Sequence, residues 1–220
     1  MAHYLIHAVP KRMWYVEKYL IPSMKEQGCK DIDVYVDEKQ EGNLQSYINA
    51  YLTLPDDKAG TWHLEDDVVI CKDFRRRTEF YDGGIVCGFS SKMYDEDKPA
   101  GIVNVEQKWF SFPCIRIPNK IARECAEWIA TYIIGNAVYR SFWEGGKNID
   151  WAFWSYVRDY YYQTKIENLA PNLVDHVDYL VGGSSCAKKR VEKCRSQYWE
   201  DEYVVEKLAE KLSTVNQFSS

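Results

Sequence analysis

Three consecutive carboxylates, Glu65, Asp66 and Asp67, follow directly on a predicted short strand at residues 62–64. Like charges at this spacing repel one another, and a bound cation is the simplest way to relieve the repulsion. If the extended geometry continues, Glu65 and Asp67 point to one side and Asp66 to the other. Hard oxygen ligands with open positions beside them suit Mn2+ or Mg2+. The sequence therefore predicts a divalent metal site with Glu65 and Asp67 as ligands.

The elements that position these carboxylates are strands alternating with helices. The predicted strands cover residues 4–9, 31–37, 62–64, 85–89 and 109–117, and the predicted helices cover 12–27, 43–54, 73–81, 119–134 and 150–162. Gly28 is expected to end the first helix, and Pro22 to kink or divide it. The alternation indicates an α/β fold with three layers and a mainly parallel sheet. In such sheets ligands gather beyond the carboxyl ends of the strands, where Pro10, Asp37 and residues 65–67 fall.

The acidic run carries a family resemblance. Leu64-Glu65-Asp66-Asp67-Val68 resembles the DxD-type motif of GT-A glycosyltransferases in a Glu-Asp-Asp variant, and the order of parts is similar from about residue 4 to residue 185. The resemblance implies a GT-A (Rossmann-like) catalytic domain over residues 1–186. A helical tail over 187–220 would pack on this domain or on a partner. The resemblance also implies that the following residues contact the nucleotide: Ala8, Val9, Pro10, Arg12, Asp37 and Asp66.

Two later residues resemble further parts of a GT-A site. Asp150 is similar in placement to the carboxylate that receives the acceptor's proton in inverting members, and a plain helix N-cap is the alternative role. His176 resembles the late histidine that completes the metal or diphosphate site, and a structural histidine is the alternative. We therefore expect Asp150 as the catalytic residue and His176 as a third metal ligand.

The resemblance implies a metal-dependent glycosyltransferase that moves a sugar, with a hexose expected, from a nucleoside diphosphate sugar to an acceptor hydroxyl. A UDP-sugar is the favoured donor. The acceptor stays open among a glycan, a protein, a small molecule and a modified nucleic acid. Two alternatives remain: a metal-dependent nucleotidyltransferase, and a non-enzymatic binding module stabilised by a cation. The first normally has a glycine-rich loop after its first strand, which residues 8–12 lack.

The composition limits which partners and which cellular compartment are expected. The net charge is −5 and the basic residues form no long run apart from residues 188–190, so a broad nucleic-acid footprint is missing. The seven cysteines are scattered without a CxxC pair, which indicates inert thiols in a reducing cytosol. No signal segment or apolar run of spanning length is present, so a cytoplasmic protein is expected.

Residues 94–107 form a predicted surface loop over the site. Residues 182–185 could wrap phosphate oxygens or form a flexible turn.

Overall fold

A seven-stranded mixed sheet forms the centre of the molecule. The computed structural model describes residues 1–81, 83–89, 101–103, 112–135, 149–164, 166–182, 199 and 201–216. The strand order is β2-β1-β3-β7-β5-β8-β6, with bounds β1 His3–Ala8, β2 Asp31–Val36, β3 Gly60–Glu65, β5 Ile85–Cys87, β6 Gly101–Val103, β7 Cys114–Pro118 and β8 Ile166–Asn168. Five of the seven strands run in one direction, and only β7 and β6 oppose them. The predicted α/β fold with a mainly parallel sheet is confirmed.

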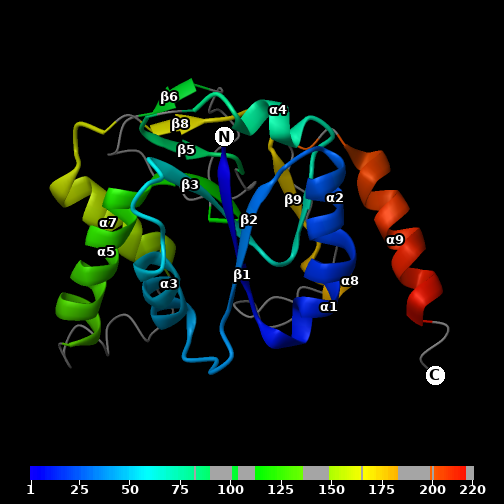
Figure 1. Cartoon of the computed structure of the whole chain (residues 1–220), viewed down its shortest axis with the longest axis horizontal. Helices are drawn as coiled ribbons and strands as arrows, with labels where there is room; N and C mark the ends of the chain where they lie inside the picture. Colours follow the sequence, from blue (N-terminus) through cyan, green and yellow to red (C-terminus); the bar gives the residue numbers. More distant parts are fainter. Residues whose placement is uncertain are drawn as a thin grey trace.

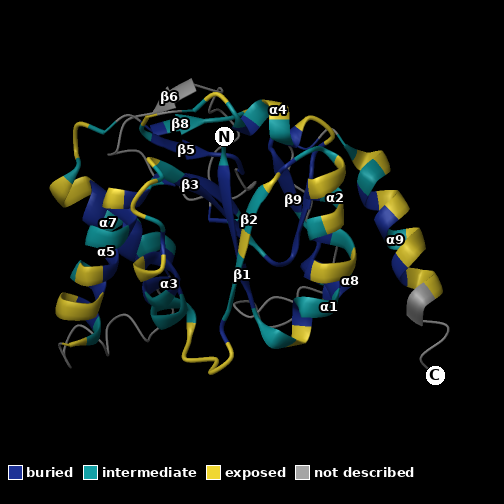
Figure 2. Cartoon of the chain, viewed as in Figure 1, coloured by how far each residue is buried: buried dark blue, intermediate teal, exposed yellow. Residues whose placement is uncertain are grey.

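Helices cover both faces of this sheet, which gives the predicted three layers (Figure 1). On one face lie α3 (Asn43–Leu52), α5 (Asn119–Trp128) and α7 (Ile149–Tyr160), and on the other lie α1 (Met13–Tyr15), α2 (Ile21–Glu26), α4 (Phe74–Thr78), α8 (Asp178–Val181) and α9 (Glu202–Asn216). Each face has its own apolar core, because side chains alternate along the strands. In β3, Trp62 and Leu64 enter the core under α1 and α2. The buried interior and the exposed outer faces of the helices separate clearly in Figure 2.

The first helical segment departs from the prediction in its internal geometry. It begins with a 3-10 turn at Pro10–Arg12 and contains a π-helical turn at Val16–Leu20, directly before α2. Pro22 is the second residue of α2, just after this π-helical turn. Gly28 ends the segment with a φ of 84°, a conformation that favours glycine, so the predicted stop is confirmed.

Two short strands outside the central sheet matter for the site. β4 (Val68–Ile70) pairs antiparallel with β9 (Val174–His176), and Val68 lies opposite His176. The sequence did not predict β9 or β8 as strands. The expectation of a loop over residues 94–107 is wrong for 101–103, which form β6 and pair with β8. The other residues of that predicted loop lie outside the described part of the chain.

The end of the described chain packs back onto the sheet. In α9, Val205, Leu208 and Leu212 are buried in the same apolar core as β1 and α2. The predicted tail helix began at about residue 187, but residues 183–198 lie outside the described part. Within the described residues the cysteines 29, 71, 87, 114 and 125 are all free and buried. Among the described helices, none combines the length and the apolar character needed to cross a bilayer.

Candidate metal centre

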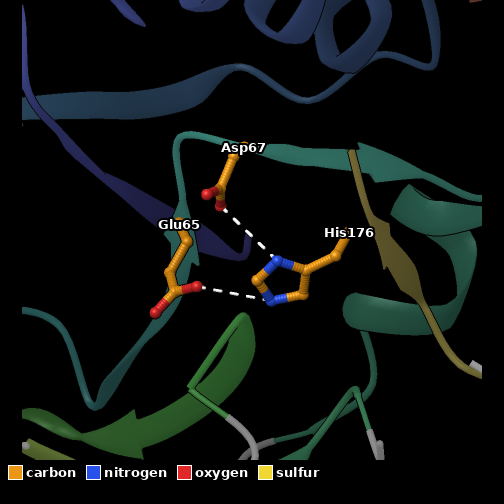
Figure 3. Close-up of side chains that lie close together, drawn as sticks. All are labelled: Glu65, Asp67 and His176. Carbon is orange, nitrogen blue, oxygen red and sulfur yellow. Dashed lines mark ion pairs between the residues drawn. The ribbon is translucent and has the colours of Figure 1, made fainter. Parts of the chain in front are cut away.

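Three side chains converge beyond the carboxyl end of β3. Glu65 Oε2 lies 3.4 Å from His176 Nε2, and Asp67 Oδ1 lies 3.8 Å from His176 Nδ1. The imidazole thus stands between the two carboxylates, as Figure 3 shows. One ligand atom from each of the three residues fits within 4.8 Å of the others. The structure therefore brings together the three residues that the sequence analysis assigned to a metal.

The local fold explains this convergence. β3 ends at Glu65, and a tight turn at 66–67 leads into β4, so Asp67 follows Glu65 around a corner. The pairing of β4 with β9 then places His176 beside that corner, and Val177 N donates to the Asp67 carbonyl oxygen at 2.8 Å. The rings of His176 and Phe89 contact each other edge to face, with centroids 5.2 Å apart. Backbone pairing and one aromatic contact thus hold His176 in place.

A buried arginine neutralises part of the acidic run. Arg12 Nη2 lies 2.7 Å from Asp66 Oδ1, and Arg12 Nη1 lies 2.6 Å from Asp67 Oδ2. The Arg12 and Asp67 side chains are each 6% exposed and that of Asp66 is 2% exposed, so these ion pairs are screened little by water. Burial alone would lower the pKa of Arg12, but Asp67 and Asp66 outweigh it and raise that pKa above its ordinary value. One cation thus bridges two of the three carboxylates.

The residues present fit a divalent cation. Asp67 Oδ1 and His176 Nδ1 are buried and have no hydrogen-bond partner within the described part of the chain. Burial raises the pKa of Glu65 well above its usual range, and the charges of Asp67, Asp150 and Asp66 raise it further. An uncompensated negative field of this kind is what a cation relieves. Two carboxylates and an imidazole are a donor set that Mn2+ accepts.

Some of the residues predicted to contact the nucleotide bind other residues of this chain. Asp66 Oδ2 accepts a hydrogen bond from Val9 N at 2.7 Å, and its other oxygen faces Arg12. Arg12 N donates to Val9 O at 3.0 Å, which closes the loop that follows β1. The observed contacts of Asp66 and Arg12 are structural, and their contact with a nucleotide stays a prediction, as it does for Ala8, Val9 and Pro10. Ala8 and Pro10 flank this loop, with Ala8 at the end of β1.

Asp37 organises the neighbouring loop after β2. It is buried, its backbone N–H donates to Ala8 O at 2.9 Å, and its side-chain Oδ1 accepts from Glu41 N at 3.4 Å. The end of β2 is thereby tied to the end of β1. Asp37 lies at the same edge of the sheet as Glu65, because β2 and β3 both run parallel to β1. Its contact with a nucleotide base remains a prediction.

Asp150 lies in the first turn of α7, on the α3 side of the sheet. It is the second residue of the helix, and the amide that precedes it, Ile149 N, donates to Asn43 Oδ1 of α3 at 2.8 Å. Asn43 therefore satisfies part of the helix start, which Asp150 would cap in its alternative role. The charge of Asp150 raises the pKa of Glu65, which puts the two carboxylates within electrostatic reach. Its role as a base stays a prediction.

A buried polar cluster on β1 and β3 was not predicted from the sequence. His7 Nε2 and His63 Nδ1 share a hydrogen bond of 2.9 Å, and His7 stacks on Tyr47 with centroids 4.1 Å apart. Burial lowers the pKa of His7 to about 3 and that of His63 well below its ordinary value, so both rings are neutral. A signal existed, because strand alternation places His7, His63 and Glu65 on one face of the sheet.

Several aromatic residues lie in the part of the chain that follows β6. Phe112 is a core residue, with its ring 5.4 Å from Tyr47 and 5.5 Å from Phe153. Trp151 and Trp154 contact each other edge to face at 5.9 Å on α7. Trp109, Phe110 and Trp143 lie outside the described residues. Residues 183–185 and the basic residues 188–190 lie outside them too.

No protein-family model matches this chain, and no curated protein matches it in sequence. Its structure is similar to that of a Drosophila β1,4-galactosyltransferase 7 variant in complex with manganese, UDP-Gal and xylobiose, at 9% identity over 94% of this chain and 79% of that chain, with a TM-score of 0.44. It is similar to galactosyltransferase LgtC in complex with donor and acceptor sugar analogs, at 13% identity over 96% of each chain, with a TM-score of 0.42. A third match is HddC from Yersinia pseudotuberculosis complexed with GMP-PN, at 12% identity over 56% of this chain and 80% of that chain, with a TM-score of 0.33. At these identities and TM-scores, the likenesses do not assign a reaction to this chain.

Proposed function

We propose that this chain is a metal-dependent glycosyltransferase of the GT-A type, which moves a sugar from a nucleoside diphosphate sugar to an acceptor hydroxyl. The observation that carries the proposal is the convergence of Glu65, Asp67 and His176 beyond the carboxyl end of β3. In α/β sheets this edge is where ligands bind. We take a UDP-hexose as the favoured donor, and residues 1–186 as the catalytic domain.

The binding part of the proposal assigns the donor to the loops beyond β1, β2 and β3. Glu65, Asp67 and His176 would hold Mn2+ or Mg2+, which supplies positive charge against the negative charge that develops on the leaving diphosphate. The loop from Ala8 to Arg12 would line the nucleotide, with Asp37 beside it. The ion pairs of Arg12 make this loop rigid before any ligand arrives, which favours catalysis by placement.

The catalytic part assigns the acceptor to Asp150. In an inverting reaction, a carboxylate oxygen of Asp150 would take the proton of the acceptor hydroxyl while the hydroxyl oxygen bonds to the anomeric carbon of the sugar. The bond from the sugar to the diphosphate breaks, and the electron pair leaves with the nucleoside diphosphate. The placement of Asp150 on the Glu65 side of the sheet supports this assignment.

The test is a thermal-shift screen of nucleoside diphosphate sugars with and without Mn2+, followed by product analysis. We expect one donor to raise the Tm only when Mn2+ is present, and slow hydrolysis of that donor to release the nucleoside diphosphate. Release of pyrophosphate from a nucleoside triphosphate would instead favour a nucleotidyltransferase. Metal binding with no turnover of any nucleotide would favour a cation-stabilised binding module. No metal-dependent shift with any donor would contradict the proposal.

A further inference from the structure

Arg12 occupies an unusual position for a residue expected to touch a nucleotide. Its side chain is 6% exposed, and its guanidinium lies 2.7 Å from Asp66 Oδ1 and 2.6 Å from Asp67 Oδ2. We propose that Arg12 is a positioning residue that orients Asp67 toward the metal and sets the site's preference for divalent over trivalent ions. This inference rests on the proposed metal site, and it gives Arg12 a role other than nucleotide binding.

Arg12 fixes the orientation of the Asp67 carboxylate. A carboxylate has two oxygens, and Arg12 holds Asp67 Oδ2, so Oδ1 is the oxygen left on the side of His176. Asp67 Oδ1 is buried and has no hydrogen-bond partner among the described residues. The planar fork of arginine can hold two carboxylates at once, which the single ammonium of lysine does less well. The fork thereby fixes which oxygen is available to a cation.

Arg12 also changes the net charge of the site. Ionised Glu65, Asp66 and Asp67 carry three negative charges, and buried Arg12 offsets one of them. Arg12 therefore makes the site less negative by one charge, which disfavours a trivalent ion more than a divalent one. Asp150 also acts on Glu65 through its charge, but it is common to all the variants below and does not affect their comparison. Removing the positive charge of Arg12 makes the potential at the site more negative. The electrostatic attraction energy of a trivalent ion then increases more than that of a divalent ion, because the energy is proportional to the ion's charge.

Asp66 provides the matched control. Its oxygens face Val9 N and Arg12, so it belongs to the ion pair rather than to the three convergent ligands. Asp66→Asn removes one negative charge, and Arg12→Met removes one positive charge. The double variant Arg12→Met with Asp66→Asn leaves the same net charge as the wild type. Arg12→Lys keeps the positive charge but replaces the planar guanidinium with a single ammonium group.

The experiment measures the affinities of Mn2+ and Tb3+ for each purified variant by isothermal titration calorimetry. From Coulomb's law at a partly screened site, we expect Arg12→Met to shift the affinity ratio toward Tb3+ by roughly tenfold. The double variant should return the ratio to that of the wild type. Arg12→Lys should keep the ratio and weaken both ions by roughly tenfold, because the orientation of Asp67 is lost.

The outcomes separate the two proposals. If wild-type protein binds neither ion, the metal site fails, and the proposed function fails with it. If the wild type binds Mn2+ but Arg12→Met lowers both affinities by the same factor, Arg12 is only structural and this inference is overturned. Should Arg12→Met not fold, the double variant is compared with Asp66→Asn alone. The same roughly tenfold shift toward Tb3+ between these two supports the inference, and an unchanged ratio refutes it.

Discussion

Replacement of His176 by alanine tests the metal centre most directly. The substitution removes one of the three convergent ligands, changes no carboxylate, and leaves the backbone pairing of β9 with β4 intact. At a free Mn2+ concentration of about 100 times the dissociation constant, binding stabilises the native state by about 2.7 kcal/mol. A ligand loss that weakens binding by roughly 100-fold reduces this to about 0.4 kcal/mol at the same concentration.

These free energies convert to a measurable difference in Tm. A chain of about this length changes its Tm by roughly 3 °C per kcal/mol, so the Mn2+-induced rise should fall from about 8 °C to about 1 °C. The assay is differential scanning fluorimetry of each protein with and without Mn2+, so that each variant is compared with its own metal-free state. This comparison removes the stability lost with the Phe89 contact.

His3→Ala is the matched control. His3 is also a buried histidine with a carboxylate contact, since its Nε2 lies 3.0 Å from Asp33 Oδ2, but it stands at the start of β1. We expect this variant to lower the metal-free Tm and to keep the full Mn2+-induced rise. An undiminished rise in His176→Ala, or an equal reduction in both variants, would refute the assignment of His176 as a ligand.

Three further predictions concern the base, the helix that carries it, and pH. Asp150→Asn should reduce transfer by roughly 10²- to 10⁴-fold while Mn2+-dependent donor binding persists, and retained turnover in a coupled assay of nucleoside diphosphate release would rule out Asp150 as the base. Asn43→Ala removes the acceptor for Ile149 N, so denaturant titration should show a loss of about 1 kcal/mol, with slower transfer and unchanged Mn2+ affinity. Asn43→Asp should restore the stability, because its carboxylate can accept the same hydrogen bond. Burial and then the charges of Asp67, Asp150 and Asp66 raise the pKa of Glu65, so protons compete with the metal as pH falls. The Mn2+-induced rise in Tm should therefore be smaller near pH 5.5 than near pH 7.5, and an equal rise at both would count against Glu65 as a ligand.

Part of this arrangement could be predicted because its signals are local. The apolar run before Glu65, the alternation in β2, and the helical spacing around Tyr47 each lie within one element, so they predict that element without knowledge of its neighbours. Together they predicted the α/β class and the edge at which Glu65 lies. The helix predicted over residues 119–134 is present as α5, and it continues as a π-helical turn at Ile129–Ile134 that the sequence did not predict.

The remainder depends on contacts between distant segments. β9 has three residues and becomes a strand only through pairing with β4, so its own sequence contains too little periodicity to identify it. The Arg12 ion pairs need the loop after β1 to lie against the turn after β3, and no spacing within one segment encodes that contact. Strand alternation places His7 and His63 on one face, but their hydrogen bond also depends on the register of β1 against β3, which neither strand encodes alone.

The distance along the chain between the ligands has a consequence for biosynthesis. His176 follows Asp67 by roughly a hundred residues, so the metal centre is complete only when β9 has left the ribosome and paired with β4. A nascent chain that ends after β8 carries the two carboxylates without the imidazole and without the pairing that orients it. If Glu65, Asp67 and His176 bind a metal as proposed, metal binding would report completion of the domain, because the native state contains the site and the unfolded chain does not.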